Sequence, residues 1–438
     1  MLRALLVFGT RPEAVKMAPI VHECMRRPAE IEPVVCCTGQ HRELLFQATQ
    51  YFELRCEVEL HVMRPDQSPA EVAARALAAL DDVLHHYRPQ CVAAQGDTTT
   101  VLAASLAAFY RRVPFVHVEA GLRTGNLAAP FPEEFNRRAA SLAAALHCAP
   151  TAWAAQNLIR EGAVPARVHV TGNTVVDALL WTLQRERCRQ AYWRDKYAFL
   201  GERPLVLITG HRRESFGPGM ERICTAISRL AAAHPEVEYV YPVHLNPRVC
   251  HTVQALLRGR PNIHLLPPLP YPEFVWLMDR ATVVLTDSGG VQEEAPSLGK
   301  PVVVMRETTE RPEAVHAGLA TLVGTHIDRI VAAVSRHLLM PRGESNSARP
   351  NPFGDGRSAR RIVDLIVGRA WDLGPCENGQ AATPCAAPAA TSAAAPLPAD
   401  RIPPPGIPPD GMRPNRIPCH AIPAEHMPAE RTPASGGY

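Results

Sequence analysis

Hydrophobic residues fall in short runs that alternate with helical patterns from Leu2 to about Val170. The runs ALLVFG, EPVVCCTG, CVAAQGD and PFVHVEA are each followed by a stretch in which apolar positions have helical spacing. Short apolar runs separated by helices are typical of buried strands in a parallel sheet that is covered by helices. The first part of the chain is therefore predicted to form an α/β domain.

The same pattern starts again after a charged helical segment at residues 181–204. Its apolar runs are PLVLITG, VEYVYPVH, NIHLLPP, TVVLTDSGG and KPVVVMRE, and the apolar positions from Ile362 to Val367 predict a closing helix. Beyond about Trp371 the chain is rich in Pro and Ala and has no apolar periodicity. We predict a disordered tail there, with a docking segment for an unknown partner as the alternative.

These patterns predict an α/β fold with two Rossmann-like, doubly wound domains. The predicted units are an N-terminal domain at 1–172, a second domain at 173–354, a closing helix at 355–370 and the tail at 371–438. A length of 438 residues fits two domains that each have a core.

Composition narrows the class of protein further. The 46% hydrophobic and 20% charged fractions are those of a soluble globular protein, and no apolar run approaches the roughly 18 residues of a membrane helix. The apolar start is too short for a signal peptide, so we expect a cytoplasmic location. A net charge of +3 does not indicate nucleic-acid binding. The 12 cysteines include no C-x-x-C pair, which favours reduced thiols over zinc ligands or disulfides.

Polar residues follow the predicted strands of the first domain, where open α/β sheets bind ligands. Arg11 and Lys16 lie at the start of a helix in VFGTRPEAVK, and both can favour a phosphate there. Alternatively, the residues from Thr10 to Glu13 only cap this helix. The motif is neither GxGxxG nor a P-loop. Asp97 follows another strand as a candidate acid or as a helix N-cap.

Further carboxylates come from the next two segments. Glu119 follows the strand PFVHV, and Glu133 lies in PFPEEFNRR. Any one of these acids can be a cap or a surface residue. Several of them at one edge of a sheet indicate an acid/base site.

The second domain contributes a complementary set of groups. His211 ends the stretch LITGH, His244 follows another strand, and Ser288 begins a Ser-Gly-Gly turn whose amides can bind an anion. Glu293 and Glu294 come next and would repel a phosphate, so at least one of them is predicted to bind neutral hydroxyls such as those of a ribose. The two sets together predict a nucleoside-diphosphate sugar held between the domains.

The sequence resembles the bacterial, non-hydrolysing UDP-N-acetylglucosamine 2-epimerases from about residue 4 to residue 368. The resemblance rests on the stretches FGTRPEAVKMAP, QGDTTT, HVEAGLRTG, PEEFNRR, TGNTVVDALLW, TGHRRESFG, YPVHLNP, TDSGGVQEEAPSLGKPVVVMRETTERPEAV and GDG. It implies a glycosyltransferase-B type of fold in which the final helix packs back on the N-terminal domain. It also implies a cytoplasmic homodimer that needs neither metal nor nicotinamide.

The resemblance further implies the reaction and its residues. The family interconverts UDP-N-acetylglucosamine and UDP-N-acetylmannosamine by anti elimination of UDP to 2-acetamidoglucal and syn re-addition, for use in surface polysaccharides. The implied catalytic residues are Asp97, Glu119, Glu133 and His211. The implied substrate-binding residues are Arg11, Lys16, Ser288, Gly289, Gly290, Glu294 and Arg311. A second UDP-N-acetylglucosamine can act as an activator in this family, and the candidate effector residues are Gln40, His41, Arg212 and His244.

Several interpretations remain open from the sequence. The base and the acid cannot be assigned among the carboxylates. A hydrolysing epimerase that releases UDP and N-acetylmannosamine, a retaining glycosyltransferase and a catalytically silent sugar-nucleotide sensor are the alternatives. The pentapeptide RPEAV occurs at Arg11 and again at Arg311. We expect each copy to open a helix after a strand, so that one arginine from each domain grips the diphosphate.

Overall fold

The computed structural model describes residues 1–39, 42–64, 67–212, 215–340 and 349–372. The predictions for Gln40, for His41 and for the tail beyond residue 372 lie outside these residues. In the described part of the chain, no helix is long and apolar enough to span a membrane. The described cysteines are all free thiols.

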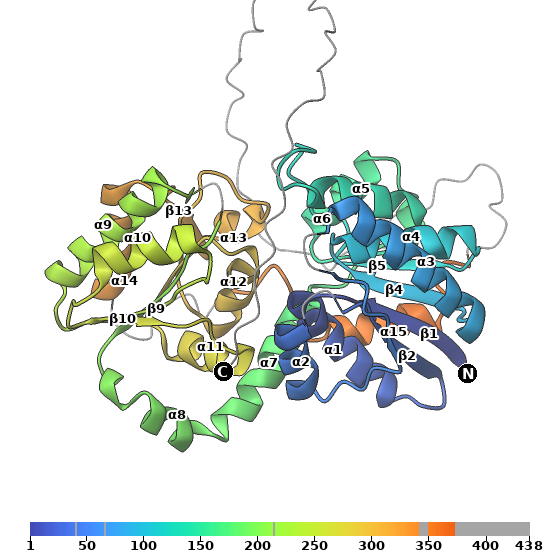
Figure 1. Ribbon diagram of the computed structural model, residues 1–438, viewed down its shortest axis with the longest axis horizontal. Helices are drawn as coiled ribbons and strands as arrows, with labels where there is room; N and C mark the ends of the chain where they lie inside the picture. Colours follow the sequence, from blue (N-terminus) through green and yellow to red (C-terminus); the bar gives the residue numbers. More distant parts are fainter. Residues whose placement is uncertain (40–41, 65–66, 213–214, 341–348, 373–438) are drawn as a thin grey trace, which may run out of the picture. The chain divides into compact units, whose positions relative to one another are not determined.

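The first sheet has seven parallel strands in the order β3-β2-β1-β4-β5-β6-β7 (Figure 1). Its strands are β1 (Leu2–Phe8), β2 (Ile31–Cys37), β3 (Val58–Glu59), β4 (Cys91–Gln95), β5 (Phe115–Val118), β6 (Ala144–Ala149) and β7 (Val168–Val170). The helices between them are α1 (Arg11–Met25), α2 (Arg42–Tyr51), α3 (Pro69–Tyr87), α4 (Thr99–Tyr110), α5 (Glu133–Ala143) and α6 (Ala152–Arg160).

The second sheet has six parallel strands in the order β10-β9-β8-β11-β12-β13. Its strands are β8 (Leu205–Thr209), β9 (Glu238–Pro242), β10 (Ile263–Leu266), β11 (Val283–Thr286), β12 (Val302–Val304) and β13 (Ala320–Leu322). The helices around them are α8 (Gln190–Lys196), α9 (Pro218–Ala233), α10 (Pro247–Leu257), α11 (Tyr271–Arg280), α12 (Gly289–Glu294), α13 (Pro312–His316) and α14 (Ile327–Leu339). These two sheets confirm the predicted fold class.

The strand order places a ligand crevice in each sheet. The chain direction across the sheet reverses between β1 and β4 in the first sheet and between β8 and β11 in the second. In doubly wound sheets, ligands bind outside the carboxyl ends of the strands at such switch points. Arg11 opens the helix after β1, and the loops after the other three strands carry Asp97, His211 and Ser288.

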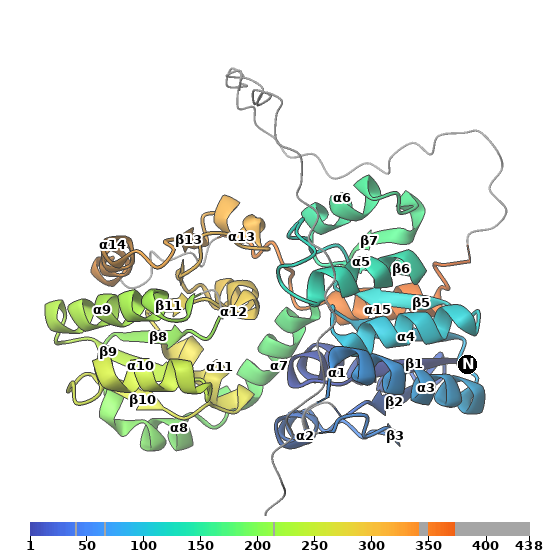
Figure 2. The same ribbon diagram turned by 45° about the horizontal axis from the view of Figure 1, so that its top comes forward.

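Two helices, α7 (Thr174–Arg187) and α15 (Ser358–Val367), connect the sheets. Helix α7 packs against α1 of the first sheet and against α11 and α12 of the second. Helix α15 packs on α1 (Figure 2). It buries Ile362 and Ile366 in the core of the first sheet. The Asp177 carboxylate of α7 caps α15 by accepting the N–H of Ala359 at 2.9 Å. The domain boundaries given above remain predictions.

Candidate active site

The turn from β1 to α1 is fixed by a glycine and a capping box. A Cβ atom on Gly9 would lie 2.2 Å from the Thr38 hydroxyl oxygen, so only glycine fits there. Thr10 caps α1, and Glu13 Oε2 accepts the N–H groups of Gly9 at 3.0 Å and of Thr10 at 2.7 Å. The capping interpretation of Glu13 is therefore confirmed. It does not compete with a ligand role for Arg11 and Lys16, which line the cavities described below.

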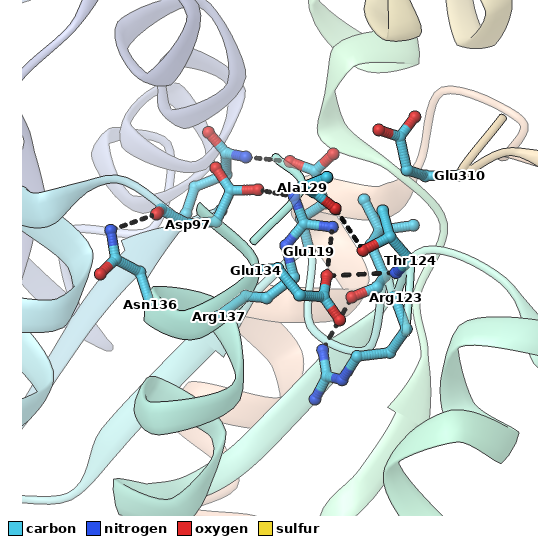
Figure 3. Close-up of polar contacts among 12 residues, drawn as sticks. Asp97, Glu119, Arg123, Thr124, Ala129, Glu134, Asn136, Arg137 and Glu310 are labelled. Atoms are coloured by element: carbon cyan, nitrogen blue, oxygen red, sulfur yellow. Dashed lines mark hydrogen bonds and ion pairs between the residues drawn. The ribbon is translucent and has the colours of Figure 1, made fainter. Parts of the chain in front are cut away.

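In the turn from β4 to α4, Asp97 does not cap the helix, so its carboxylate can face the site. Thr98, and not Asp97, is the N-cap residue, because the Thr98 hydroxyl accepts the N–H of Val101 at 3.3 Å. The Asp97 carbonyl accepts a hydrogen bond from Asn136 Nδ2 at 3.0 Å, and the Asp97 carboxylate forms an ion pair with Arg137 (Figure 3). The Asp97 side chain remains 28% exposed.

Arg137 connects Asp97 to the loop that follows β5. Its guanidinium NH1 lies 3.4 Å from Oε2 of the fully buried Glu134, one turn earlier in α5. Glu134 in turn accepts the N–H groups of Thr124 at 3.1 Å and Gly125 at 3.3 Å (Figure 3). Sequence reasoning missed Arg137 and Asn136. Both lie in the stretch PEEFNRR, and α5 buries them while it exposes Phe135 and Leu142.

Glu119 follows β5 directly and is held by groups from both sheets. Its backbone lies in the left-handed region with φ 61°, which is uncommon for a residue with a side chain. Lys16 Nζ lies 2.7 Å from Oε1 and 2.8 Å from Oε2, Asn173 Nδ2 donates to Oε1 at 3.1 Å, and Gln95 donates to Oε2. Arg311 NH2 lies 3.8 Å from Oε1. The Glu119 side chain is 3% exposed.

These contacts decide the charge state of Glu119 and Lys16. Burial alone would raise the pKa of Glu119, but the charges of Lys16 and Arg311 hold it below its ordinary value. Burial alone would lower the pKa of Lys16, but Glu119 and Glu293 raise it. Both groups are therefore ionised at neutral pH.

Glu293 completes this network from α12. It is fully buried, and it accepts hydrogen bonds from Arg311 Nε at 2.8 Å and from Asn173 Nδ2 at 3.0 Å. Lys16 Nζ lies 3.8 Å from its Oε2. The two cations thus meet the carboxyl groups of Glu119 and Glu293 in the interior, and Glu310 Oε2 adds a third carboxyl group 3.4 Å from Arg311 NH1. Sequence reasoning did not single out Asn173, which contacts both carboxylates and also caps α7.

A cavity of about 210 Å³ brings two of the three predicted catalytic carboxylates together. It is lined by Lys16, Gln95, Asp97, Glu119, Arg137 and Arg311, among others. The third, Glu133, begins α5 and is not part of this lining. Its Oε2 atom is buried and has no hydrogen-bond partner among the described residues. The acidic cavity is therefore built on Asp97 and Glu119.

A second cavity of about 350 Å³ carries the predicted nucleotide-binding residues. It is lined by Arg11, Lys16, His211, His244, Ser288, Gly290 and Glu294, among others. Lys16 lines both cavities. The Tyr271 hydroxyl donates to Glu294 Oε1 at 2.6 Å, and burial raises the pKa of Glu294 to about 7. At neutral pH this carboxyl group can both donate to and accept from sugar hydroxyls.

The two RPEAV copies differ in their surroundings. Both prolines lie in the first turn of a helix, but α13 begins well after β12 has ended at Val304, so the second copy does not follow a strand directly as we expected. Arg11 lines the larger cavity, and Arg311 lines the acidic one. A Cβ atom on Gly289 would lie 2.8 Å from Arg311 Cζ, so this glycine makes room for the guanidinium.

Two of the candidate effector residues are described. The His244 ring, from an exposed residue, stacks on His211, with the ring centroids 5.5 Å apart and the planes at 15°. Arg212 follows His211, and its Nε is buried without a hydrogen-bond partner among the described residues. Of these two residues, His244 lines the larger cavity and Arg212 is not part of its lining.

Residues 22–367 match the family model described as UDP-N-acetylglucosamine 2-epimerase. A Ralstonia solanacearum protein described as a probable UDP-N-acetylglucosamine 2-epimerase is 51% identical over 371 residues, which cover 84% of this chain and 99% of that protein. The crystal structure of UDP-GlcNAc 2-epimerase from Neisseria meningitidis bound to UDP-GlcNAc is 44% identical, with a TM-score of 0.80 over 84% of this chain and all of that one.

A more distant structure has the same architecture. The UDP-GlcNAc 2-epimerase of Methanocaldococcus jannaschii, in complex with UDP-GlcNAc and UDP, is 30% identical. It superposes with a TM-score of 0.73 over 84% of this chain and all of that one.

Proposed function

Because this chain belongs to the UDP-N-acetylglucosamine 2-epimerase family, we propose that it interconverts UDP-N-acetylglucosamine and UDP-N-acetylmannosamine by inversion at C2. The observation that carries the proposal is the pair of cavities that share Lys16. One is lined by the carboxyl groups of Asp97 and Glu119 together with Arg137 and Arg311, and the other by Arg11, His211 and a serine-glycine turn. A sugar whose C2 must be deprotonated fits the first, and a uridine diphosphate fits the second.

Binding follows from the groups around the larger cavity. Arg11, Lys16 and the turn from Ser288 to Gly290 hold the diphosphate through charge and backbone amides. Glu294 takes the ribose hydroxyls, in keeping with its raised pKa. Arg311 then faces the diphosphate from the acidic cavity, and the diphosphate competes with Glu119 for Lys16 and Arg311.

The first chemical step breaks two bonds of the substrate. A carboxylate takes the C2 proton, the C2 electron pair forms the C1–C2 double bond of 2-acetamidoglucal, and the C1–O bond breaks so that UDP leaves with its electrons. Positive charge grows at C1 as this bond lengthens, and a nearby carboxylate stabilises it. The departing diphosphate gains charge, which Lys16, Arg11 and His211 stabilise.

The second step reverses the first, except that the proton returns to the other face of C2. A second acid delivers a proton to the opposite face of C2, and UDP adds again to C1. Two carboxyl groups on different sides of one sugar are needed, and Asp97 and Glu119 line the same cavity from the ends of neighbouring strands. Glu133 is the third candidate, and its buried, unpartnered Oε2 leaves it available if the substrate reorders the start of α5.

We also propose a homodimer. Helices α4 and α5 pack together, and they expose Phe109, Tyr110, Phe135 and Leu142, the last by 88%. Exposed apolar side chains on adjoining helices are typical of a protein interface. Sedimentation of the wild-type protein and of Leu142→Glu tests this surface, since a dimer there predicts a shift of the variant toward monomer. We also assign the product to surface polysaccharide synthesis, as the resemblance to this family implies.

The function is tested by product analysis. The purified protein is incubated with UDP-N-acetylglucosamine and, separately, with UDP-N-acetylmannosamine, and the nucleotide sugars are separated by anion-exchange chromatography. The proposal predicts the same mixture of both compounds from either side. Free N-acetylmannosamine with UDP would identify a hydrolysing enzyme, and unchanged substrate would favour the sensor or the transferase.

A further inference from the structure

Asp287 lies behind His211 and is not accounted for by the proposed reaction. It follows β11 directly, just before Ser288, and its side chain is fully buried. Its Oδ2 accepts the N–H of His211 at 2.7 Å and the N–H of Arg212 at 2.8 Å. One carboxylate oxygen therefore fixes the backbone of the loop after β8.

The second oxygen faces the imidazole ring. His211 Nδ1 lies 3.2 Å from Asp287 Oδ1. Within the described residues, Oδ1 is buried and accepts no hydrogen bond of good geometry, so its contact with His211 is an ion pair at this distance. Burial alone would raise the pKa of Asp287, but the contact with His211 and the two backbone N–H groups lower it, so the carboxylate is ionised.

The same loop is held on its other side. Asp287 N–H donates to the Thr209 carbonyl at 3.1 Å, and the Tyr241 hydroxyl donates to the Gly210 carbonyl at 3.0 Å. A Cβ atom on Gly210 would lie 2.9 Å from the Tyr241 hydroxyl oxygen. The backbone that carries His211 is thus fixed on both sides, while its side chain is 40% exposed and lines the larger cavity.

We propose that Asp287 is the positioning residue of His211: it accepts a hydrogen bond from Nδ1–H and directs Nε2 toward the diphosphate. An anionic partner at Nδ1 fixes the tautomer and stabilises the imidazolium, as the aspartate does in a serine-protease triad. The imidazolium then donates from Nε2 to the phosphate oxygen on which negative charge grows as the C1–O bond breaks. This inference rests on the proposed function.

The substitution Asp287→Asn separates this role from a structural one. The asparagine oxygen can still accept the two backbone N–H groups. Its NH₂ group then faces His211 Nδ1 and donates to it, which removes the anion and holds the ring as the neutral Nε2–H tautomer. Nε2 still donates to the phosphate, but the positive charge of the ring is lost. The loop geometry is retained, so the variant tests the charge of His211 and not the position of the loop.

A double-mutant cycle measures whether Asp287 acts through His211. Turnover of UDP-N-acetylglucosamine is determined for the wild type, Asp287→Asn, His211→Asn and the double variant, with the melting temperature of each. We expect Asp287→Asn to lower kcat at least about 30-fold in the wild-type background and less than about threefold in the His211→Asn background, because coupled residues are not additive. KM should change less than kcat.

The control is Asp279→Asn, which alters an aspartate of the same domain that pairs with Arg187 at 3.2 Å, away from both cavities. It should retain normal turnover. Equal losses from Asp287→Asn in both backgrounds, or a loss explained by a lower melting temperature, would overturn the positioning role. An inactive wild type would instead overturn the proposed function, so the two failures are distinguishable.

Discussion

Asp97 and Glu119 follow neighbouring strands of one sheet and line one cavity, but their surroundings differ. Asp97 is partly exposed and pairs with one cation, Arg137, from its own sheet. Glu119 is almost fully buried and contacts Lys16 from the first sheet and Arg311 from the second. Local sequence places both carboxylates at the strand ends, and long-range contacts give them different environments.

These different surroundings suit Asp97 and Glu119 to different roles in the reaction. Glu119 lies among the cations that are proposed to hold the diphosphate, so its freedom to act depends on whether those cations are engaged by substrate. Asp97 depends on α5, since Arg137 and Asn136 both come from that helix. A group whose cations are taken by the substrate is suited to a step that begins on binding, whereas Asp97 is positioned before the substrate arrives.

The largest expected effect comes from removing either carboxylate. Asp97→Asn and Glu119→Gln should each lower kcat at least about a hundredfold, because each removes an acid/base group. Only Glu119→Gln should also lower the melting temperature clearly, since it takes a counter-charge from two nearly buried cations. Turnover assays and thermal unfolding check this. A carboxamide variant with a near-normal rate would remove that residue from the mechanism.

An intermediate effect is expected from Arg137→Met. Without the guanidinium, Asp97 loses the group that holds its carboxylate, and we predict a fall in kcat of about 10- to 100-fold. Arg138→Met is the matched control, because Arg138 is the neighbouring residue and contacts only Glu161, at 3.5 Å, among the described ion pairs. Rescue of the rate by Arg137→Lys would support a role in charge and position. Equal rates for the Arg137 and Arg138 variants would contradict it.

The smallest expected effect is on the pH dependence of stability, which should differ between Glu119 and Glu294. The folded-state pKa of Glu294 is about 7 against an ordinary 4.5, so the folded protein retains a proton that the unfolded chain releases, and its contribution to stability falls as pH rises through this window. Glu119 has a lowered pKa, so its contribution is present above 4.5 and is lost as pH falls through its folded-state pKa.

Thermal unfolding of Glu294→Gln and Glu119→Gln at pH 5 and pH 8 measures this contrast. Between pH 5 and pH 8, the melting temperature of Glu294→Gln should rise by several degrees relative to that of the wild type. Glu119→Gln should remain destabilised at both values, because both lie above 4.5. Parallel pH profiles for wild type and Glu294→Gln would show that this carboxyl group does not titrate in the window.

The sequence predicted the long buried strands and the loops that carry the site, because β1, β4, β8 and β11 are apolar runs that end in polar residues. It did not single out β3, β6, β7 or β13. Three of these strands have only two or three residues and too little periodicity to detect, and β6 is an alanine-rich strand that follows α5 without a break. Asn173, Arg137 and Asp287 were missed because each acts through a contact far away in sequence. For Glu133 the opposite happened. Its motif predicted a catalytic role, but no contact among the described residues explains such a role.

The measurement that tests the account most directly is proton NMR of the protein with UDP-N-acetylglucosamine in deuterated water. The account predicts that UDP-N-acetylmannosamine appears with deuterium at C2, because the proton removed from one face exchanges with solvent before another is delivered to the opposite face. Product that forms with its original C2 proton, or substrate that stays unchanged and undeuterated, would contradict deprotonation at C2 by the carboxylates of the acidic cavity.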